Sequence, residues 1–92
     1  MRRILAGEGE KQKTFFVKNN VLVGEQLENG IVLKIKVQKI KSPDGKRKRY
    51  YINRGGYIIG WISEDLNRCK GTNSKQQNLL NDIASAMKIV QM

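Results

Sequence analysis

A regular alternation of apolar and polar residues near the middle of this 92-residue chain constrains its fold most strongly. Within residues 31–41, Leu33, Ile35 and Val37 alternate with lysine and glutamine. This period of two is typical of a β-strand that buries one face and exposes the other to water. We therefore predict a long strand over residues 31–41.

Two tight turns after this strand predict that the chain folds back on itself twice. The sequence Ser-Pro-Asp-Gly at residues 42–45 favours a turn, because proline presets φ, aspartate bonds to the nearby backbone and glycine accepts a positive φ. Residues 46–54 then return as a second strand. Gly55-Gly56 turns the chain again, and residues 57–62 form a third strand. The three strands predict an antiparallel meander.

The N-terminal third of the chain adds shorter elements to this meander. Residues 1–10 lack a clear pattern and contain two glycines, so we expect a loose lead-in. Residues 13–18 are rich in strand-forming side chains, and residues 21–23 form a further short strand after an Asn-Asn turn. Residues 24–30 form a connection that ends in Asn-Gly, a hairpin signal.

Helical patterns follow only after the third strand. Ser63 and the two acidic residues after it provide an N-cap and an acidic first turn for a helix of at most two turns, which Gly71 ends. A second cap at residues 72–74 precedes an apolar stripe at helical spacing. The stripe consists of Leu79, Leu80, Ile83, Met87 and Val90. We expect this amphipathic helix to cover the apolar face of the sheet.

These elements together predict an α+β fold. Its parts are an antiparallel β-meander of four to five strands with a protruding basic β-hairpin, then a short helix and a C-terminal amphipathic helix. The length fits one domain over residues 11–92, preceded by the lead-in of residues 1–10. Because the core is small, we also expect a homodimer through the C-terminal helix or a sheet edge.

The positive charge of the chain is concentrated in one hairpin. The formal net charge is +10, from 18 basic and 8 acidic residues. Residues 34–54 hold nine basic residues against Asp44 alone, which gives +8 in 21 residues and leaves +2 for the other 71. A three-residue turn at residues 43–45 would place Lys41 opposite Arg47, Lys39 opposite Arg49 and Val37 opposite Tyr51. Such opposed like charges destabilise a strand pair. Both faces of residues 39–49 are largely basic and have nothing to bury, so we expect the distal hairpin to extend as an arm that binds a polyanion.

A basic β-ribbon predicts nucleic-acid binding. A ribbon of this kind fits a DNA groove, and binding phosphates would offset the repulsion between its charges. The candidate binding residues are Lys34, Lys36, Lys39, Lys41, Lys46, Arg47, Lys48, Arg49, Tyr50 and Arg54. Among the aromatic residues, we expect Tyr50 to contact bases, and Tyr51, Tyr57 and Trp61 to lie in the core.

The composition argues against catalysis. The chain contains no histidine and one cysteine, Cys69, which removes the usual general base, the Ser/His and Cys/His pairs, and the cysteine-rich zinc sites. Its acidic residues and glycines match neither a shared metal site nor a phosphate-binding loop. We therefore predict a non-enzymatic protein, regulatory or architectural, with no cofactor, metal or small-molecule ligand. A metal-dependent nuclease is a minor alternative.

The kind of polyanion stays open at this point. The charge pattern does not distinguish DNA from RNA or duplex from single strand, and an acidic protein surface is an alternative partner. No apolar run approaches the roughly 20 residues that span a bilayer, so we expect no membrane association. With a lone cysteine, we expect a cytoplasmic or nucleoid-associated protein.

Overall fold

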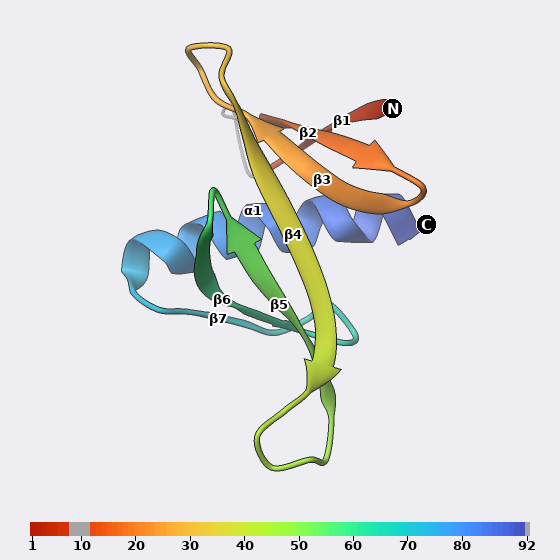
Figure 1. The fold of residues 1–92 in the computed structure, drawn as a ribbon, viewed down its shortest axis with the longest axis vertical. Helices are drawn as coiled ribbons and strands as arrows, with labels where there is room; N and C mark the ends of the chain where they lie inside the picture. Colours follow the sequence, from red (N-terminus) through yellow and green to blue (C-terminus); the bar gives the residue numbers. More distant parts are fainter. Residues whose placement is uncertain (8–11, 92) are drawn as a thin grey trace.

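The computed structural model describes residues 1–7 and 12–91, which form an antiparallel sheet followed by one helix (Figure 1). The strands are β1 (Arg2–Ala6), β2 (Lys13–Lys18), β3 (Val21–Gln26), β4 (Val32–Lys41), β5 (Lys48–Arg54), β6 (Tyr57–Ser63) and β7 (Cys69–Gly71), and the helix is α1 (Ser74–Gln91). The strands lie in the sheet in the order of the sequence, and every pair is antiparallel. The predicted α+β meander is thus confirmed, with seven strands rather than four or five.

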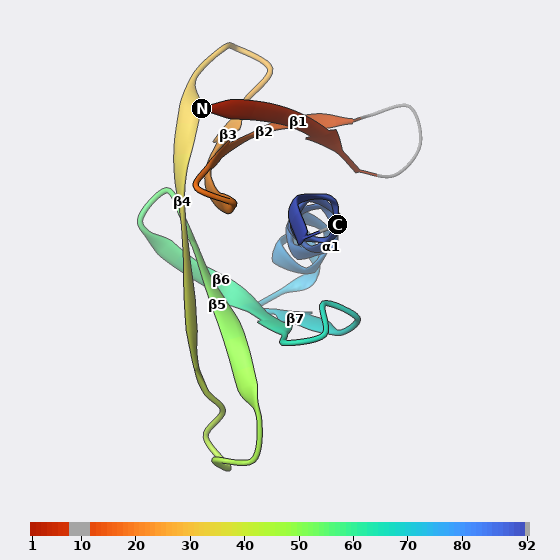
Figure 2. The same cartoon turned by 90° about the vertical axis from the view of Figure 1, so that its right-hand side faces the viewer.

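Strand β4 joins two halves of the sheet. Its residues 32–34 pair with β3, and its residues 35–41 pair with β5. The sheet curls at this strand, so that β1–β3 lie on one side of α1 and β5–β7 on the other (Figure 2). Helix α1 contacts β6 and β7 in one half and β1, β2 and β3 in the other. The core therefore lies inside the curl, between the helix and both halves of the sheet.

The apolar stripe of α1 fills this core as its spacing predicts. Helix residues Leu80, Ile83 and Met87 are buried against strand residues that include Phe15 and Ile52. Asn73 caps the helix, because its side-chain oxygen accepts a hydrogen bond from the backbone N–H of Gln76 at 2.9 Å. Within the described residues, no helix has the length and apolarity needed to cross a membrane.

Three predicted segments are wrong. Residues 24–26 are not part of a connection but continue strand β3. Residues 2–6 are not a loose lead-in but the edge strand β1, which pairs with β2 and buries Ile4 and Ala6 in the core. Residues 8–10 of that lead-in lie outside the described residues. The short helix predicted from Ser63 is instead a loop followed by β7. Ser63 and Asp65 do bond to backbone N–H groups as helix caps do, but here they stabilise a tight loop.

The predicted register of the basic hairpin is also wrong, by one residue. The loop between β4 and β5 is longer than the predicted turn, and the backbone N–H of Ser42 bonds to the carbonyl of Arg47 at 2.7 Å. Lys41 therefore lies opposite Lys48, and Val37 lies opposite Ile52. A shift of one residue exchanges the two faces of a strand, so Ile52 is buried and Tyr51 moves to the outer face.

The hairpin still extends beyond the neighbouring strands β6 and β7, as predicted (Figures 1 and 2). The pairing between β5 and β6 stops at Arg49 and Ser63, so the residues between Ile40 and Arg49 lie beyond the end of β6. Two opposed like-charge pairs were predicted, whereas the observed register opposes Lys41 to Lys48 and places Arg49 opposite Ile40. The repulsion within the ribbon is accordingly smaller than the sequence indicated.

Candidate nucleic-acid interface

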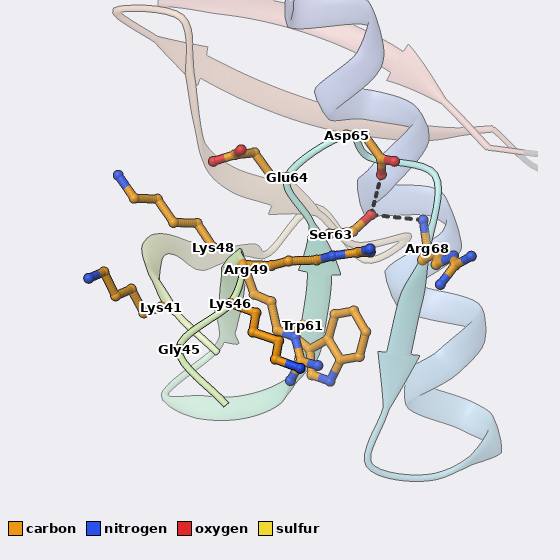
Figure 3. A pocket seen from close by; sticks show the side chains of 11 residues that line it. Lys41, Gly45, Lys46, Lys48, Arg49, Trp61, Ser63, Glu64, Asp65 and Arg68 are labelled. Carbon is orange, nitrogen blue, oxygen red and sulfur yellow. Dashed lines mark hydrogen bonds between the residues drawn. The ribbon is translucent and has the colours of Figure 1, made fainter. Parts of the chain in front are cut away.

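A basic groove of about 740 Å³ lies between the hairpin arm and the connection from β6 to β7 (Figure 3). Its basic lining residues are Lys41, Lys46, Arg47, Lys48, Arg49 and Arg68. Trp61 and Ser63 of β6 also line the groove, as do the acidic residues Glu64 and Asp65. Six basic and two acidic side chains leave the groove with a formal charge of +4. The groove therefore favours an anion with several negative charges.

Two loops of the same construction line this groove. We call residues 42–47 (Ser-Pro-Asp-Gly-Lys-Arg) the tip loop and residues 63–68 (Ser-Glu-Asp-Leu-Asn-Arg) the side loop. In each loop the backbone N–H of the first residue donates a hydrogen bond to the backbone carbonyl of the last residue, at 2.7 Å in the tip loop and 2.8 Å in the side loop. In each, the fourth-residue N–H donates back to the carbonyl of the serine at 2.9 Å. The fourth residues, Gly45 and Leu66, have φ values of 69° and 66°.

The serine and aspartate side chains complete the same pattern in both loops. The hydroxyl of Ser42 donates to the carboxylate of Asp44, and the hydroxyl of Ser63 donates to Asp65 at 2.5 Å. Each carboxylate also accepts a backbone N–H two residues further on, at 3.0 Å in both loops. The last residue of each loop is an arginine, Arg47 in the tip loop and Arg68 in the side loop. The shared hydrogen bonding places the two arginines at equivalent positions, and both line the groove.

These hydrogen bonds keep the two aspartates in the loops ionised to low pH. The serine hydroxyl is the main cause that lowers the pKa of Asp44 below its ordinary value near 3.8, and the backbone N–H of Lys46 adds to it. Ser63, and then the backbone N–H of Asn67, lowers the pKa of Asp65 in the same way. Because both carboxylates serve the loop backbone, their charges help to hold the loops in shape.

Glu64 and Lys39 form an ion pair next to the groove. The ammonium of Lys39 lies 3.1 Å from a carboxylate oxygen of Glu64 and 5.5 Å from the centroid of the Tyr50 ring. The hydrogen bond to Glu64, followed by the charge interaction with Tyr50, raises the pKa of Lys39 above its ordinary value of 10.5. Lys39 thus compensates one of the two acidic groups that line the groove.

The structure divides the predicted basic site residues among four places. The groove brings together Lys41, Lys46, Arg47, Lys48 and Arg49. Lys34 and Lys36 lie on the same outer face of β4 but outside the groove lining, and both are exposed. Lys39 lies in the ion pair with Glu64. Arg54 is held by Glu25, with its Nε and a terminal nitrogen 3.1 Å and 2.9 Å from the two carboxylate oxygens.

The roles expected for the aromatic residues are largely reversed. Tyr50, predicted to contact bases, packs against the buried core. Tyr51 and Trp61, predicted to be core residues, lie opposite each other on the outer face of the sheet and are partly exposed. Tyr57 is 78% exposed at the turn between β5 and β6. The guanidinium carbon of Arg49 lies 3.9 Å from the centroid of the Trp61 ring, a close cation–π contact.

Sequence reasoning missed Arg68 as a residue of the groove and placed Tyr51 and Trp61 in the core instead of on the outer face. Arg68 could have been found from the match between the sequences Ser-x-Asp-x-x-Arg at residues 42–47 and 63–68. Tyr51 was misplaced because its face depends on the register between β4 and β5, which the length of the tip loop decides. Trp61 lies opposite Tyr51 in the pairing of β5 with β6 and shares its face.

Among the described residues, no group of three or more acidic or cysteine side chains is placed to hold a metal ion. Comparison of the chain with protein-family models, curated protein sequences and solved structures finds no match.

Proposed function

We propose that this protein binds nucleic acid without catalysing a reaction, and that the basic groove holds the phosphates. The observation that carries the proposal is the convergence of six basic side chains on one groove, five from the hairpin of β4 and β5 and one, Arg68, from the connection between β6 and β7. A sugar-phosphate backbone, with its regular row of negative charges, matches a groove of this positive charge. Phosphate contacts of this kind position a nucleic acid without reading its sequence.

The paired loops explain how the groove would hold a phosphate from two sides. Arg47 projects from the tip loop and Arg68 from the side loop, and both are exposed. A guanidinium group can give two parallel hydrogen bonds to a phosphate, and its charge does not depend on pH in the ordinary range. The rigid hydrogen bonding of each loop would fix these arginines before the ligand arrives, which reduces the entropy lost on binding.

The test is the salt dependence of binding in a variant that lacks both arginines. Fluorescence polarisation with labelled duplex DNA, single-stranded DNA and RNA gives the slope of log affinity against log salt concentration. We expect the double variant Arg47→Ala/Arg68→Ala to bind more weakly and to reduce this slope by about two. The matched control is Lys75→Ala/Lys88→Ala, which removes the same charge from exposed positions of α1.

Two results would contradict the proposal. One is an unchanged slope in the arginine variant, or an equal loss in the lysine control, because either would assign the binding to overall charge. The other is no binding of any of the three nucleic acids near about 100 mM salt, where phosphate contacts of this number still give measurable affinity. The second result would favour an acidic protein as the partner of the groove.

A further inference from the structure

The outer face of the sheet, on the side away from α1, carries an aromatic pair beside the basic groove. The strand register aligns Gln38, Tyr51, Trp61 and Lys70 in one row across β4–β7. Opposed residues of antiparallel strands point to the same side, so the rings of Tyr51 and Trp61 share one surface. Trp61 also lines the groove, which makes the row and the groove one continuous surface.

Other side chains on this face extend the same character. In the next row, Lys36 of β4 lies opposite Asn53 of β5, and Asn53 lies opposite Ile58 of β6. On the other side of the aromatic row, Ile40 pairs with Arg49. Lys36, Ile40 and Ile58 are exposed, and Ile58 has an exposed fraction of 54%. The face thus combines partly exposed rings and apolar side chains with flanking positive charges.

We propose that this aromatic row binds the unpaired bases of a single-stranded nucleic acid while its phosphates occupy the basic groove. The inference deepens the proposed function and rests on it, because the groove supplies the phosphate contacts. A single strand presents the flat faces of its bases, which stack on aromatic rings and on guanidinium planes. In a duplex these faces are covered by neighbouring base pairs, so Tyr51 and Trp61 would have nothing to stack on.

The contact between Arg49 and Trp61 fits this use of the row. The guanidinium group 3.9 Å from the ring centroid is held at the border between groove and row. From this place Arg49 can bond a phosphate or stack on a base next to Trp61. Adjacent strands are about 4.8 Å apart, so Tyr51 and Trp61 are close enough to engage neighbouring bases of one strand. An acidic peptide would use the cations but would leave the aromatic pair without a matching group.

The single tryptophan of the chain gives a direct test, because its fluorescence reports stacking at Trp61. The wild-type protein is titrated with four oligonucleotides of about 12 residues, within the range of known single-strand sites. These are oligo-dT, oligo-U, an abasic DNA of equal charge, and a duplex of equal length. We expect oligo-dT or oligo-U to quench the emission, and the abasic strand and the duplex to bind through the groove without comparable quenching.

Variants separate loss of stacking from loss of folding. Tyr51→Leu is expected to weaken the binding of the quenching oligonucleotide about 10-fold, the equivalent of about 1.4 kcal/mol for one lost base contact. Its affinity for the abasic strand should not change. Trp61→Phe, which keeps a ring, should retain most of the affinity, whereas Trp61→Leu should lose about as much as Tyr51→Leu. The matched control is Tyr57→Leu, since Tyr57 lies at the β5–β6 turn, outside the aromatic row.

The outcomes distinguish this inference from the proposal on which it rests. Equal affinity for abasic and base-containing strands, equal quenching by the duplex, or an equal effect of Tyr57→Leu would overturn the aromatic row as a base-binding surface. Groove binding would stand if the arginine variant still reduced the salt slope in those experiments. Absence of binding to all four oligonucleotides would overturn both. Unchanged thermal unfolding of the Tyr51 variant confirms that its loss of affinity is not a loss of structure.

Discussion

At the scale of single residues, the ion pair between Arg54 and Glu25 has a structural role that the charge pattern of the sequence conceals. Arg54 was predicted to bind nucleic acid, yet it bonds both oxygens of a carboxylate that is 2% exposed. The pair joins β5 to β3 across β4, the strand that lies between them. Replacing one member of such a pair leaves the other charge buried without compensation.

We therefore expect Arg54→Met to lower the free energy of unfolding by about 3 kcal/mol, measured by urea denaturation. Affinity for nucleic acid, measured where the variant is still folded, should change less than in Arg47→Ala. A variant with wild-type stability and much weaker binding would return Arg54 to the interface.

Gly60 is a second residue whose importance lies in the backbone. It has a φ of 148°, and a β-carbon there would collide with the carbonyl oxygen of Lys70 and with Leu80. Gly60→Ala should therefore separate β6 from β7 and α1 and destabilise the protein by about 2 kcal/mol or more. Thermal unfolding checks this. The control is Gly56→Ala, which shares a positive φ but meets nothing within 4 Å.

At the scale of elements, the equivalence of the tip and side loops makes a gain of function predictable. Asn67 of the side loop occupies the position that Lys46 has in the tip loop, and it is exposed. Asn67→Lys should add one phosphate contact, with tighter binding and a salt slope steeper by about one. Asn78→Lys, on the exposed part of α1, adds the same charge away from the groove and should have little effect.

The loop aspartates, Asp44 and Asp65, also make the stability of the protein depend on pH in the acidic range. Because their pKa values are lowered in the folded protein, the stability they contribute is fully present above the ordinary value near 3.8. It is lost as the pH falls below 3.8 and through the lowered values. A double variant Asp44→Asn/Asp65→Asn should therefore show a shallower fall of the melting temperature over that acidic range. An acid limb of wild-type steepness would argue against the serine–aspartate bonds.

At the scale of the whole molecule, the sequence predicted the strands with strong alternation and the helix with a regular apolar stripe. Residues 31–41 alternate with a period of two, which fits only a strand. The stripe through Leu80 and Ile83 has helical spacing, which fits only a helix. The side loop failed as a prediction because serine and aspartate bond free N–H groups equally well in a helix cap and in a tight loop. Tyr50 and Tyr51 exchanged roles because adjacent residues of a strand differ only by register.

The sheet of the described residues ends at β1 and β7, and the predicted homodimer remains a prediction for these edges and for α1. The apolar stripe of α1 already packs inside its own sheet, which leaves the edges of β1 and β7 as the better surfaces for a second copy. Analytical ultracentrifugation of the wild type and of Leu5→Lys, at an exposed β1 position, distinguishes the cases. A dimer that persists in the variant would argue against the β1 edge.

The helix that spans both halves of the curled sheet has a consequence for the order of folding. Each strand pairs with its neighbour in sequence, whereas the packing of α1 on β1 joins the two ends of the chain. Loop closure over such a distance is slow, so the hairpins should form before the helix docks. Ile4→Val, in β1 under the helix, should then accelerate unfolding and hardly change the rate of folding in a stopped-flow experiment. The last contact to form on this route is also the first to be lost, and it lies at the side of the molecule opposite the basic arm.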